Sequence, residues 1–383
     1  MDSSQKLTNT DVKKLNKNRI FRLIYNSDKI SRQEIADQLG LSLPTVNQNL
    51  KMLMEDELIE YVGNFTSTGG RRAQAITINN NARKAISVNI KADYINVDVV
   101  GLKGQIIYSM AVKAHFSKSS AYIEKLTDAV RHAVDYVGAD ADDILGVGVT
   151  VPGILDDEKQ ILISAPPLKA KNYDFTRLIS AIDYPVVVMN DARAEAYADH
   201  WFNGKPEDEK IYIMLGEGVG GAYINASAIR NGVHNRGGEF GHMVIHPGGK
   251  QCLCGKKGCF EAYVSEKVLS SELDMTLDNF FELAAQGNKN NCNVLDEYMD
   301  NLALGINNIY TMMDCDIVLG GTVAPYLKQY DNSIKERLVN DYSFDTDADY
   351  LRISDGGGRK SGLGAASVSY THLRAHETTL HLV

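Results

Sequence analysis

The hydrophobic positions of the first 80 residues recur with the period of a helix and then with that of a strand. Ser31 and Glu34 have the spacing of a capping box, which marks the start of a helix. The predicted elements are a helix over 15–26, a helix from Ser31 to Gly40, a helix that begins after Ser42, and strands over 59–63 and 73–78. Three helices followed by a β-hairpin predict a winged helix-turn-helix domain in residues 1–80.

The third predicted helix has one apolar face and one face that carries amide side chains. The residues on the apolar side are Val46, Leu50 and Leu53. The opposite side carries Asn47 and Gln48, whose amide groups can each form two hydrogen bonds with adenine in the major groove. The loop between the two strands ends in Arg71 and Arg72, which would reach phosphates or a minor groove. The predicted DNA-binding residues are Pro44, Thr45, Asn47, Gln48, Lys51, Arg71 and Arg72.

Charge separates this N-terminal part from the rest of the chain. Residues 1–80 hold 11 Lys and Arg against 9 Asp and Glu, whereas the remainder holds 29 against 40. The whole chain has a net charge of -9, so only the N-terminal part points to a nucleic-acid partner. Winged helices also mediate protein contacts, and this weakly basic domain leaves that alternative open. The cations expected near the DNA backbone are Lys13, Lys14, Lys17 and Arg19.

Beyond residue 80, predicted strands alternate with predicted helices, which is typical of an α/β fold with a mixed sheet. A short polar linker over 79–85 precedes them. The predicted strands lie at 86–89, 94–102, 105–112, 144–153, 185–191 and 316–321, with a hairpin over 211–224 and helices at 120–137, 192–202, 267–272, 277–286 and 294–313. Ligands of such sheets lie at the carboxyl ends of strands, where Asn190 and Asp191 fall. We predict that these two residues bind a ligand, and capping of the following helix is the simpler alternative.

Length and composition narrow the class of protein. With 383 residues, 44% of them hydrophobic and 23% charged, the chain predicts two or three globular domains rather than a disordered or fibrous protein. The first 15 residues lack the apolar run of a signal peptide, and no apolar run approaches a membrane span, so we expect a cytoplasmic location. Residues 368–383 show no hydrophobic period, and we interpret them as a non-native or disordered tail.

The segment 238–262 holds three of the five cysteines in a glycine-rich loop. Cys252, Cys254 and Cys259, together with His242, supply three thiolates and one imidazole, a donor set that suits tetrahedral Zn²⁺. Four protein ligands would complete the tetrahedron, so we predict a structural zinc ion. The alternative is a set of buried thiols without a metal. The other two cysteines are isolated, which favours reduced thiols over a disulfide framework.

The same segment carries a resemblance to a known family. Gly-Glu-Phe-Gly-His over 238–242 and Cys-Leu-Cys-Gly-Lys-Lys-Gly-Cys-Phe-Glu over 252–261 resemble the signature of the ROK family (repressors, open reading frames and kinases). The resemblance covers about 86–367 and points to its sugar-responsive repressors, similar to those of the xylose and N-acetylglucosamine type. It implies that residues 81–383 adopt a two-lobed, actin-like (ribonuclease H-like) sugar-kinase fold. The implied lobes span about 86–205 and 206–350, and the C-terminal segment returns to the first lobe.

The resemblance also implies a sugar in the cleft between the lobes. The implied sugar ligands are Asn190, Asp191, Glu239, His242 and Glu261. Carboxylate and amide groups suit vicinal hydroxyls, and a ring nitrogen of His242 can donate to the sugar if the other nitrogen ligates the metal. In the family's kinases, the aspartate that matches Asp191 is the general base that takes the proton of the sugar hydroxyl.

Two departures from the family's pattern bear on kinase activity. Its kinases carry a phosphate-binding turn, Asp-Gly-Gly-Thr, where residues 89–94 here read Asn-Ile-Lys-Ala-Asp-Tyr. Two glycines whose amides would face phosphate are therefore replaced. Residues 164–168 read Ser-Ala-Pro-Pro-Leu where the family often has Pro-Asn, so a contact to a sugar hydroxyl is expected to be missing. The glycine run 216–221 is interpreted as a tight hairpin, with Glu217 solvated.

These observations favour a sugar-responsive transcriptional regulator, with repression as the expected mode. It would bind operator DNA as a homodimer or a higher homo-oligomer and a monosaccharide between its lobes. The alternative is an ATP-dependent sugar kinase with an added DNA-binding domain, in which Asp191 would be catalytic. A third possibility is a protein of a phosphotransferase system as the partner in place of a sugar.

Overall fold

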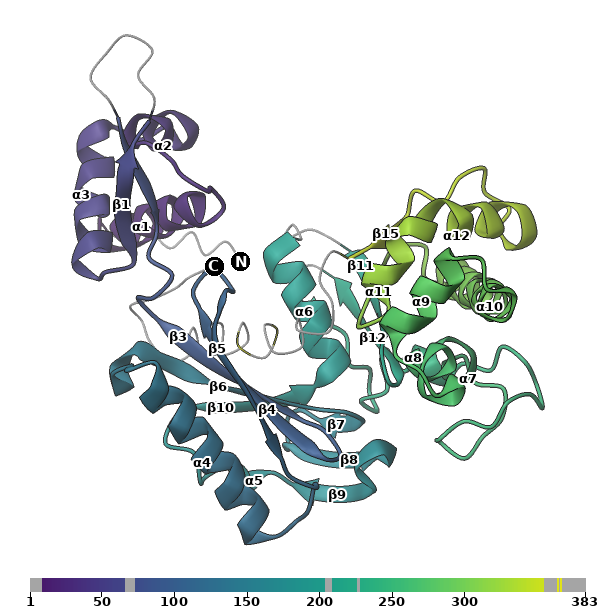
Figure 1. Ribbon diagram of the computed structural model, residues 1–383. Helices are drawn as coiled ribbons and strands as arrows, with labels where there is room; N and C mark the ends of the chain where they lie inside the picture. Colours follow the sequence, from purple (N-terminus) through teal and green to yellow (C-terminus); the bar gives the residue numbers. More distant parts are fainter. Residues whose placement is uncertain are drawn as a thin grey trace, which may run out of the picture.

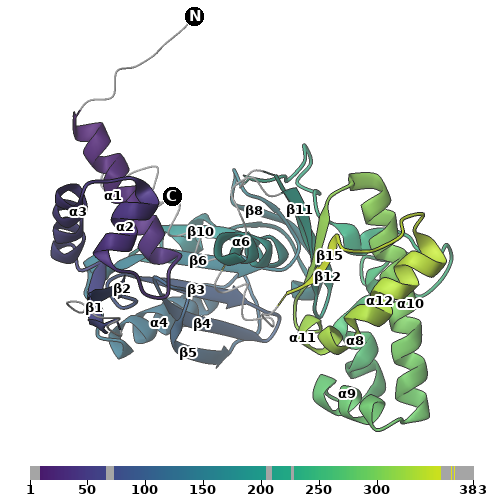
Figure 2. The ribbon, with the colours of Figure 1, turned by 90° about the horizontal axis from the view of Figure 1, so that it is seen from above.

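The computed structural model describes residues 9–65, 73–203, 209–225, 228–354, 364 and 366. Figure 1 shows a small helical domain beside two larger lobes, each built on a β-sheet. Figure 2 shows from a second direction that α6 (Asp191–Asn203) lies between the two sheets. This is the predicted order of a winged helix-turn-helix followed by a two-lobed α/β fold. The predicted tail over 368–383 lies outside the described residues.

The small domain forms because its helices and strands share one apolar core. Its elements are α1 (Asn9–Tyr25), α2 (Arg32–Leu39), α3 (Leu43–Glu55), β1 (Ile59–Asn64) and β2 (Gln74–Ile78). Both bonds of the predicted capping box are present: the Glu34 amide donates to Ser31 Oγ, and the Ser31 amide donates to Glu34 Oε2. Gly40 ends α2 with a φ of 63°. α1 begins at Asn9, earlier than predicted. Its first turns are polar and show no hydrophobic period, so the sequence pattern did not reveal them.

The first lobe is built on a five-stranded mixed sheet in the order β10-β6-β3-β4-β5. β3 pairs antiparallel with β4 and parallel with β6, and β10 pairs parallel with β6. Leu126 and Ala133 of α4 pack against the apolar side of this sheet. The elements are β3 (Lys84–Ile90), β4 (Tyr94–Gly101), β5 (Ile106–Lys113), α4 (Ser120–Tyr136), β6 (Ile144–Val151), α5 (Thr176–Ile179) and β10 (Val186–Asn190).

A separate antiparallel sheet of β7 (Ile154–Asp156), β8 (Ile161–Ala165) and β9 (Ala170–Asp174) lies at the end of the first lobe. This sheet is not evident from the sequence pattern. Its strands have three to five residues and two prolines stand between β8 and β9, so no alternating run is long enough to be recognised.

The second lobe repeats the same plan with the sheet order β13-β12-β11-β14-β15. β11 pairs antiparallel with β12 and parallel with β14. The buried face of the long helix α10 packs on this lobe's core. The elements are β11 (Glu209–Leu215), β12 (Val219–Asn225), β13 (Ala228–Ile229), α7 (Glu261–Val264), α8 (Glu266–Leu269), α9 (Leu277–Ala285), α10 (Lys289–Met313), β14 (Asp316–Gly320), α11 (Ala324–Leu327), α12 (Asp331–Arg337) and β15 (Leu351–Ile353).

The core of the winged helix continues into the first lobe. Ala82, Ala85, Val100 and Leu102 are buried in the same cluster as the apolar residues of α1–α3. The predicted linker over 79–85 is therefore too long, because β3 already begins at Lys84. A lysine can start this buried strand because its ammonium group donates to the Asn81 carbonyl oxygen at 2.9 Å and so keeps a polar partner.

Candidate functional site

A cavity of about 180 Å³ lies between the two lobes. Its walls come from the end of β3, the β10–α6 junction, the β11–β12 turn and the loop that precedes α7. The polar residues predicted as ligands that line it are Asn190, Asp191, Glu239, His242 and Glu261. The structure thus brings together five side chains that are spread over more than seventy positions of the sequence. Pro166 and Pro167 line the cavity where the sequence departs from the family's pattern.

Asn190 and Asp191 stand where β10 ends and α6 begins. The Asn190 side chain accepts a hydrogen bond from the Arg193 amide at 3.0 Å, so it caps the helix as the simpler alternative required. Its Nδ2 donates to the Gly153 carbonyl oxygen at 3.0 Å and to Asp191 Oδ1 at 3.2 Å. Capping and ligand binding are compatible here, because both side chains still line the cavity.

The Asp191 carboxyl group has an unusual proton affinity. Burial raises its pKa from the ordinary value of 3.8 to about 6, and the Ala192 amide and the Lys91 ammonium oppose the shift. Burial likewise raises the pKa of Glu239, against the influence of His242 and Arg193. Two acidic groups therefore share a partly desolvated cavity, and each can accept a hydrogen bond from a ligand hydroxyl when it is ionised.

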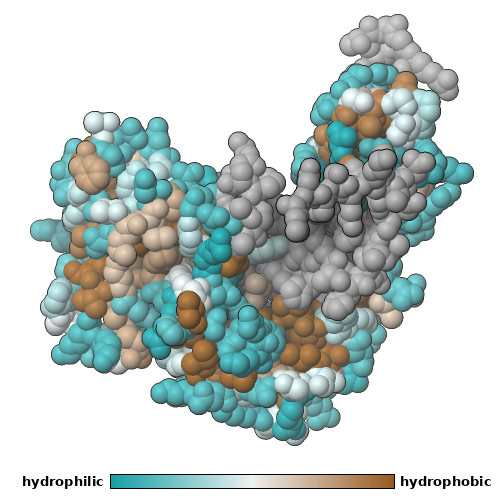
Figure 3. Space-filling view, turned by 180° about the vertical axis from the view of Figure 1, so that it is seen from behind, coloured by the Kyte–Doolittle hydropathy of each residue, from teal (hydrophilic) through white to brown (hydrophobic). Residues whose placement is uncertain are grey.

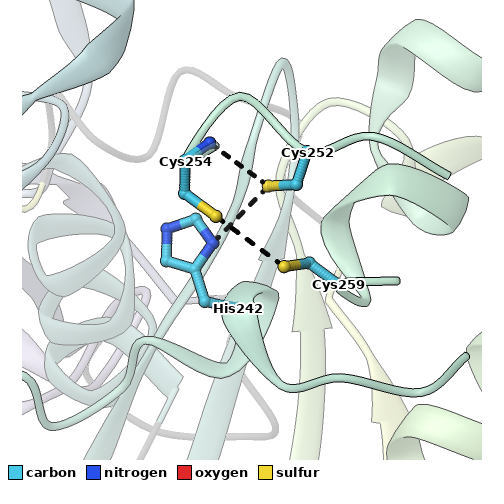
Figure 4. A group of neighbouring side chains, drawn as sticks. All are labelled: His242, Cys252, Cys254 and Cys259. Atoms are coloured by element: carbon cyan, nitrogen blue, oxygen red, sulfur yellow. Dashed lines mark hydrogen bonds between the residues drawn. The ribbon is translucent and has the colours of Figure 1, made fainter. Parts of the chain in front are cut away.

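His242, Cys252, Cys254 and Cys259 form the predicted metal cluster. One nitrogen or sulfur atom from each residue lies within 4.8 Å of the others. Cys254 Sγ is 3.8 Å from Cys259 Sγ, and Cys252 Sγ is 3.8 Å from His242 Nδ1 (Figure 4). A tetrahedron with metal–sulfur bonds of about 2.3 Å has edges of about 3.8 Å. The four donor groups therefore have a spacing that can hold a tetrahedral metal ion.

The loop reaches this geometry through short backbone hydrogen bonds and glycine turns. The Cys252 amide donates to the Lys256 carbonyl oxygen at 2.8 Å, and the Gly255 amide returns to the Cys252 carbonyl oxygen at 3.0 Å. Gly258 has a φ of 80°, and a Cβ there would lie 1.8 Å from the His246 carbonyl oxygen. A side chain at position 258 would therefore move Cys259 out of the cluster.

His242 connects the metal cluster to the cavity. Its Nδ1 faces Cys252, while its Nε2 lies 3.8 Å from Glu239 Oε2. The two ring nitrogens thus point in the directions that the sequence analysis required for a metal ligand that also faces a sugar. A metal ion bound to Nδ1 would leave the ring hydrogen on Nε2, where it could be donated to a ligand in the cavity.

Glu261, at the start of α7, is held from two sides. Its Oε2 accepts a hydrogen bond from the Val219 amide at 3.0 Å, and Cys252 Sγ lies 3.6 Å from its Oε1. A Cβ on Gly218 would approach Oε2 to 2.9 Å. A larger residue at position 218 would therefore displace the Glu261 carboxylate, which connects the β11–β12 turn to the loop that carries Cys252.

The other end of the cavity carries an ion pair between the lobes. Lys91, in the turn after β3, lies with its Nζ 3.5 Å from Glu217 Oε1 in the β11–β12 turn. Both side chains are largely exposed, which agrees with the solvated Glu217 of the sequence analysis. The glycine run forms the predicted hairpin, in which a Cβ on Gly221 would lie 2.5 Å from the Tyr212 carbonyl oxygen. Close packing accounts for that glycine.

Arg193 is a site residue that the sequence analysis missed. Its buried guanidinium group donates to Asp157 Oδ2 at 3.0 Å and to the Asn235 carbonyl oxygen at 2.9 Å. Asn231 Nδ2 donates to the same Asp157 oxygen at 2.6 Å. The group joins the small sheet, α6 and the loop after β13 beside the cavity. A lone arginine in an alanine-rich helix offers only a weak signal, because its partners lie about 36 to 42 positions away.

The predicted recognition face of α3 is exposed. Pro44, Asn47, Gln48 and Lys51 are solvent-exposed, and Thr45 is half-buried with its Oγ1 2.8 Å from Ser42 Oγ. Arg71 and Arg72 lie outside the described residues. Two of the cations expected near DNA have partners within the domain. Lys17 pairs with Asp56 at 2.6 Å, and Arg19 donates to the Leu39 carbonyl oxygen at 3.0 Å.

Comparison with known proteins identifies the family. The family model "ROK family" matches residues 85–369, and the model "Winged helix-turn-helix DNA-binding" matches residues 15–60. The chain belongs to the ROK family. It is 29% identical over 319 residues to the xylose repressor of Bacillus subtilis (strain 168), which covers 81% of this chain and 82% of the repressor.

Solved ROK structures share the fold. A ROK family transcriptional regulator, described as a homolog of the E. coli MLC protein, aligns with a TM-score of 0.69 and 21% identity over 94% of this chain and 96% of its own. A ROK family glucokinase from Streptomyces griseus, in complex with glucose and AMPPNP, aligns with a TM-score of 0.62 and 24% identity over 75% of this chain and 99% of its own. The alignment with the regulator includes the region of the winged helix, whereas the kinase covers a smaller part of the chain.

None of the helices among the described residues is both long enough and apolar enough to span a bilayer. On the face shown in Figure 3, hydrophilic residues surround the separate hydrophobic patches.

Proposed function

We propose that this ROK protein is a sugar-responsive transcriptional repressor that binds operator DNA through its winged helix. The observation that carries the proposal is the presence of an exposed amide-bearing face on α3 and a polar interlobe cavity in one chain. The xylose repressor of Bacillus subtilis supports it by its similarity over most of both chains. We assign residues 1–80 to DNA binding and residues 81–383 to sugar binding. We also propose that the protein acts in the cytoplasm.

The proposed effector is a monosaccharide contacted by Asn190, Asp191, Glu239, His242 and Glu261. Ionised Asp191 and Glu239 accept hydrogen bonds from sugar hydroxyls, and Asn190 can donate as well as accept. Support comes from the cavity volume of about 180 Å³, which suits one sugar ring, and from the family membership. Lobe closure around the sugar would then change the placement of the winged helices in a homodimer, and thereby the fit to two half-sites.

The metal proposed for the His/Cys₃ cluster is a structural zinc ion. Three thiolates and one imidazole at tetrahedral spacing support Zn²⁺, and four protein ligands leave no open position for catalysis. A bound zinc ion supplies a fixed tetrahedral cross-link in the loop. The loop then orients His242 Nε2 and Glu261 toward the cavity.

The kinase alternative has less support. Side-chain-bearing residues in the segment 89–94 replace the two glycines of the kinases' phosphate-binding turn, and Glu217 adds a carboxylate at the same end of the cavity. A carboxylate there repels nucleotide phosphates. Turnover of ATP with a panel of hexoses and pentoses, lost in Asp191→Ala, would favour the kinase over the regulator.

A two-part experiment tests the proposal. DNA fragments selected by the wild-type protein from a random library are used in a binding titration with and without D-xylose, and a thermal-shift screen covers other free sugars. We expect salt-sensitive DNA binding and a sugar that raises the melting temperature, because a ligand of the folded state stabilises it. A protein that selects no DNA and responds to no sugar is not the proposed regulator.

A further inference from the structure

The segment that joins the winged helix to the first lobe is fastened at each end. The Asn79 amide donates to the Leu58 carbonyl oxygen at 3.0 Å, and its side-chain Nδ2 donates to the Glu57 carbonyl oxygen at 3.0 Å. Toward the lobe, the Lys84 ammonium group donates to the Asn81 carbonyl oxygen at 2.9 Å. These bonds leave little freedom for a hinge between β2 and β3.

The turn between β4 and β5 holds the same segment from the side of the lobe. The Lys103 amide donates to Asn80 Oδ1 at 2.8 Å, and the Leu102 amide donates to the Asn80 carbonyl oxygen at 3.1 Å. This turn also contacts the end of α1. Tyr25 Oη donates to the Leu102 carbonyl oxygen at 3.0 Å, and Lys103 Nζ donates to the Ser27 carbonyl oxygen at 3.2 Å. Two separate parts of the winged helix are thus bound by one turn of the lobe.

The fit of this turn depends on a glycine and on apolar contacts. A Cβ on Gly101 would lie 2.4 Å from both Asn80 Nδ2 and the Asn80 carbonyl oxygen, so a larger residue would push the joining segment away. Val100 and Leu102 are 1% and 3% exposed and belong to the core of the winged helix. The junction is therefore a packed interface with a continuous core.

We propose that Tyr25, Gly101 and Lys103 are positioning residues that fix the winged helix on the first lobe, so that both move as one rigid body when the cleft closes. The inference rests on the proposed function and adds how closure of the cleft reaches the winged helix, namely through the first lobe. The second lobe would move relative to this combined body, and the separation of the two α3 helices in a dimer would follow from the first lobe. A dimer of this kind requires half-sites about one helical turn of DNA apart, or a multiple of it.

The rigid junction can be measured without DNA or sugar. Ketone-bearing amino acids at the exposed positions Lys51 and Asp128 accept spin labels and leave all native cysteines unchanged. We expect one narrow distance distribution in the wild type and a clearly broader one in Gly101→Val. The double variant Tyr25→Phe/Lys103→Ala, which removes two hydrogen bonds without a clash, covers the case in which Gly101→Val fails to fold. Broad distributions in the wild type would overturn the proposal.

The matched control is Lys125→Ala. Lys125 Nζ also donates to a backbone carbonyl oxygen at 3.2 Å, that of Lys113, but both residues belong to the first lobe. This variant should keep the wild-type distance distribution. If it broadens the distribution as much as Tyr25→Phe/Lys103→Ala does, loss of any surface lysine contact explains the effect, and the positioning role is wrong.

DNA binding provides the functional test. With DNA selected by the wild type, the double variant should bind a single half-site within about twofold of wild type and the native full site about tenfold more weakly, because a loosened link lowers the effective concentration of the second domain. It should also tolerate insertions between the half-sites that the wild type rejects, with unchanged sugar affinity. An unchanged spacing preference overturns the inference. A wild type that selects no DNA instead refutes the proposed function, and the spin-label experiment still decides the junction.

Discussion

Replacing Asp191 by asparagine should stabilise the sugar-free protein while it weakens the sugar response. The amide keeps the shape of the carboxylate and an Oδ1 that can accept the hydrogen bond now donated by the Ala192 amide at 2.9 Å. It removes the cost of holding a charge in a partly buried cavity. Burial raises the pKa of Asp191 from 3.8 to about 6. Each pKa unit corresponds to about 1.36 kcal/mol, so the raised pKa lowers the free energy of unfolding of the wild type by as much as about 3 kcal/mol at neutral pH.

The pH dependence gives the sign of the effect. A carboxyl group whose pKa is raised in the folded state contributes its full stability below the unfolded value of 3.8, and this contribution is lost as the pH rises through about 6. Asp191→Asn should therefore exceed the wild type in free energy of unfolding by about 3 kcal/mol at pH 7.5 and by about 1.5 kcal/mol at pH 5. Effects of pH on the cysteine cluster are common to both proteins and cancel in the difference.

Urea unfolding of both proteins at the two pH values measures this difference. Asp128→Asn is the control, because Asp128 is an exposed carboxylate and its removal should change the stability by less than about 0.5 kcal/mol. The same variants are titrated with the sugar found by thermal shift, and only Asp191→Asn should lose affinity. The reasoning is refuted if Asp191→Asn is no more stable than the wild type at pH 7.5, or if its advantage does not shrink at pH 5.

Three further changes test other parts of the site. Cys254→Ser should lower the zinc content measured by mass spectrometry and remove the sugar-induced thermal shift, because the loop that orients His242 loses one of its four ligands; a normal sugar response without zinc would contradict the role of the metal. Asn47→Ala with Gln48→Ala should abolish the preference for selected over random DNA, because each lost contact reduces the binding free energy that distinguishes the two by about 1–3 kcal/mol. A competition titration measures this preference, and an unchanged preference would exclude α3 as the recognition helix. Lys91→Met should weaken sugar binding only about two- to fivefold in calorimetry, since an exposed ion pair contributes less than about 1 kcal/mol, and a tenfold loss would show that more than this pair was disturbed.

The sequence predicted those parts of the molecule whose signal is local. The capping box of Ser31 and Glu34 and the period of α3 lie within a few positions, and the structure confirms both. The spacing of Cys252, Cys254 and Cys259 likewise sufficed to predict a cluster that can hold a metal. The position of Asn190 and Asp191 at a strand end predicted that they bind a ligand, but the other proposed sugar ligands needed the resemblance to the family, because nothing in the local pattern links Asp191 to Glu239.

Contacts that join distant positions could not be predicted. Lys91 and Glu217 are 126 positions apart, and Tyr25 and Leu102 are 77 apart. A single lysine, glutamate or tyrosine outside a periodic hydrophobic pattern cannot be distinguished from an ordinary surface residue in the sequence. The linker prediction failed for the same reason, because the polar stretch near Asn80 gains its partners only when the β4–β5 turn packs beside it.

The two ends of the cavity follow different chemical requirements, and this difference is the strongest argument for a sensor. At the proposed sugar end, Asp191, Glu239 and His242 retain the acceptors and donors that a polyol needs, and the loop that carries Cys252 holds His242. At the opposite end, Lys91 and Glu217 satisfy each other across the cleft, where a nucleotide would require glycine amides and a surplus of positive charge. A protein that must close around a sugar without using ATP needs the first set only. In the proposed regulator, lobe closure would then move the winged helix together with the first lobe.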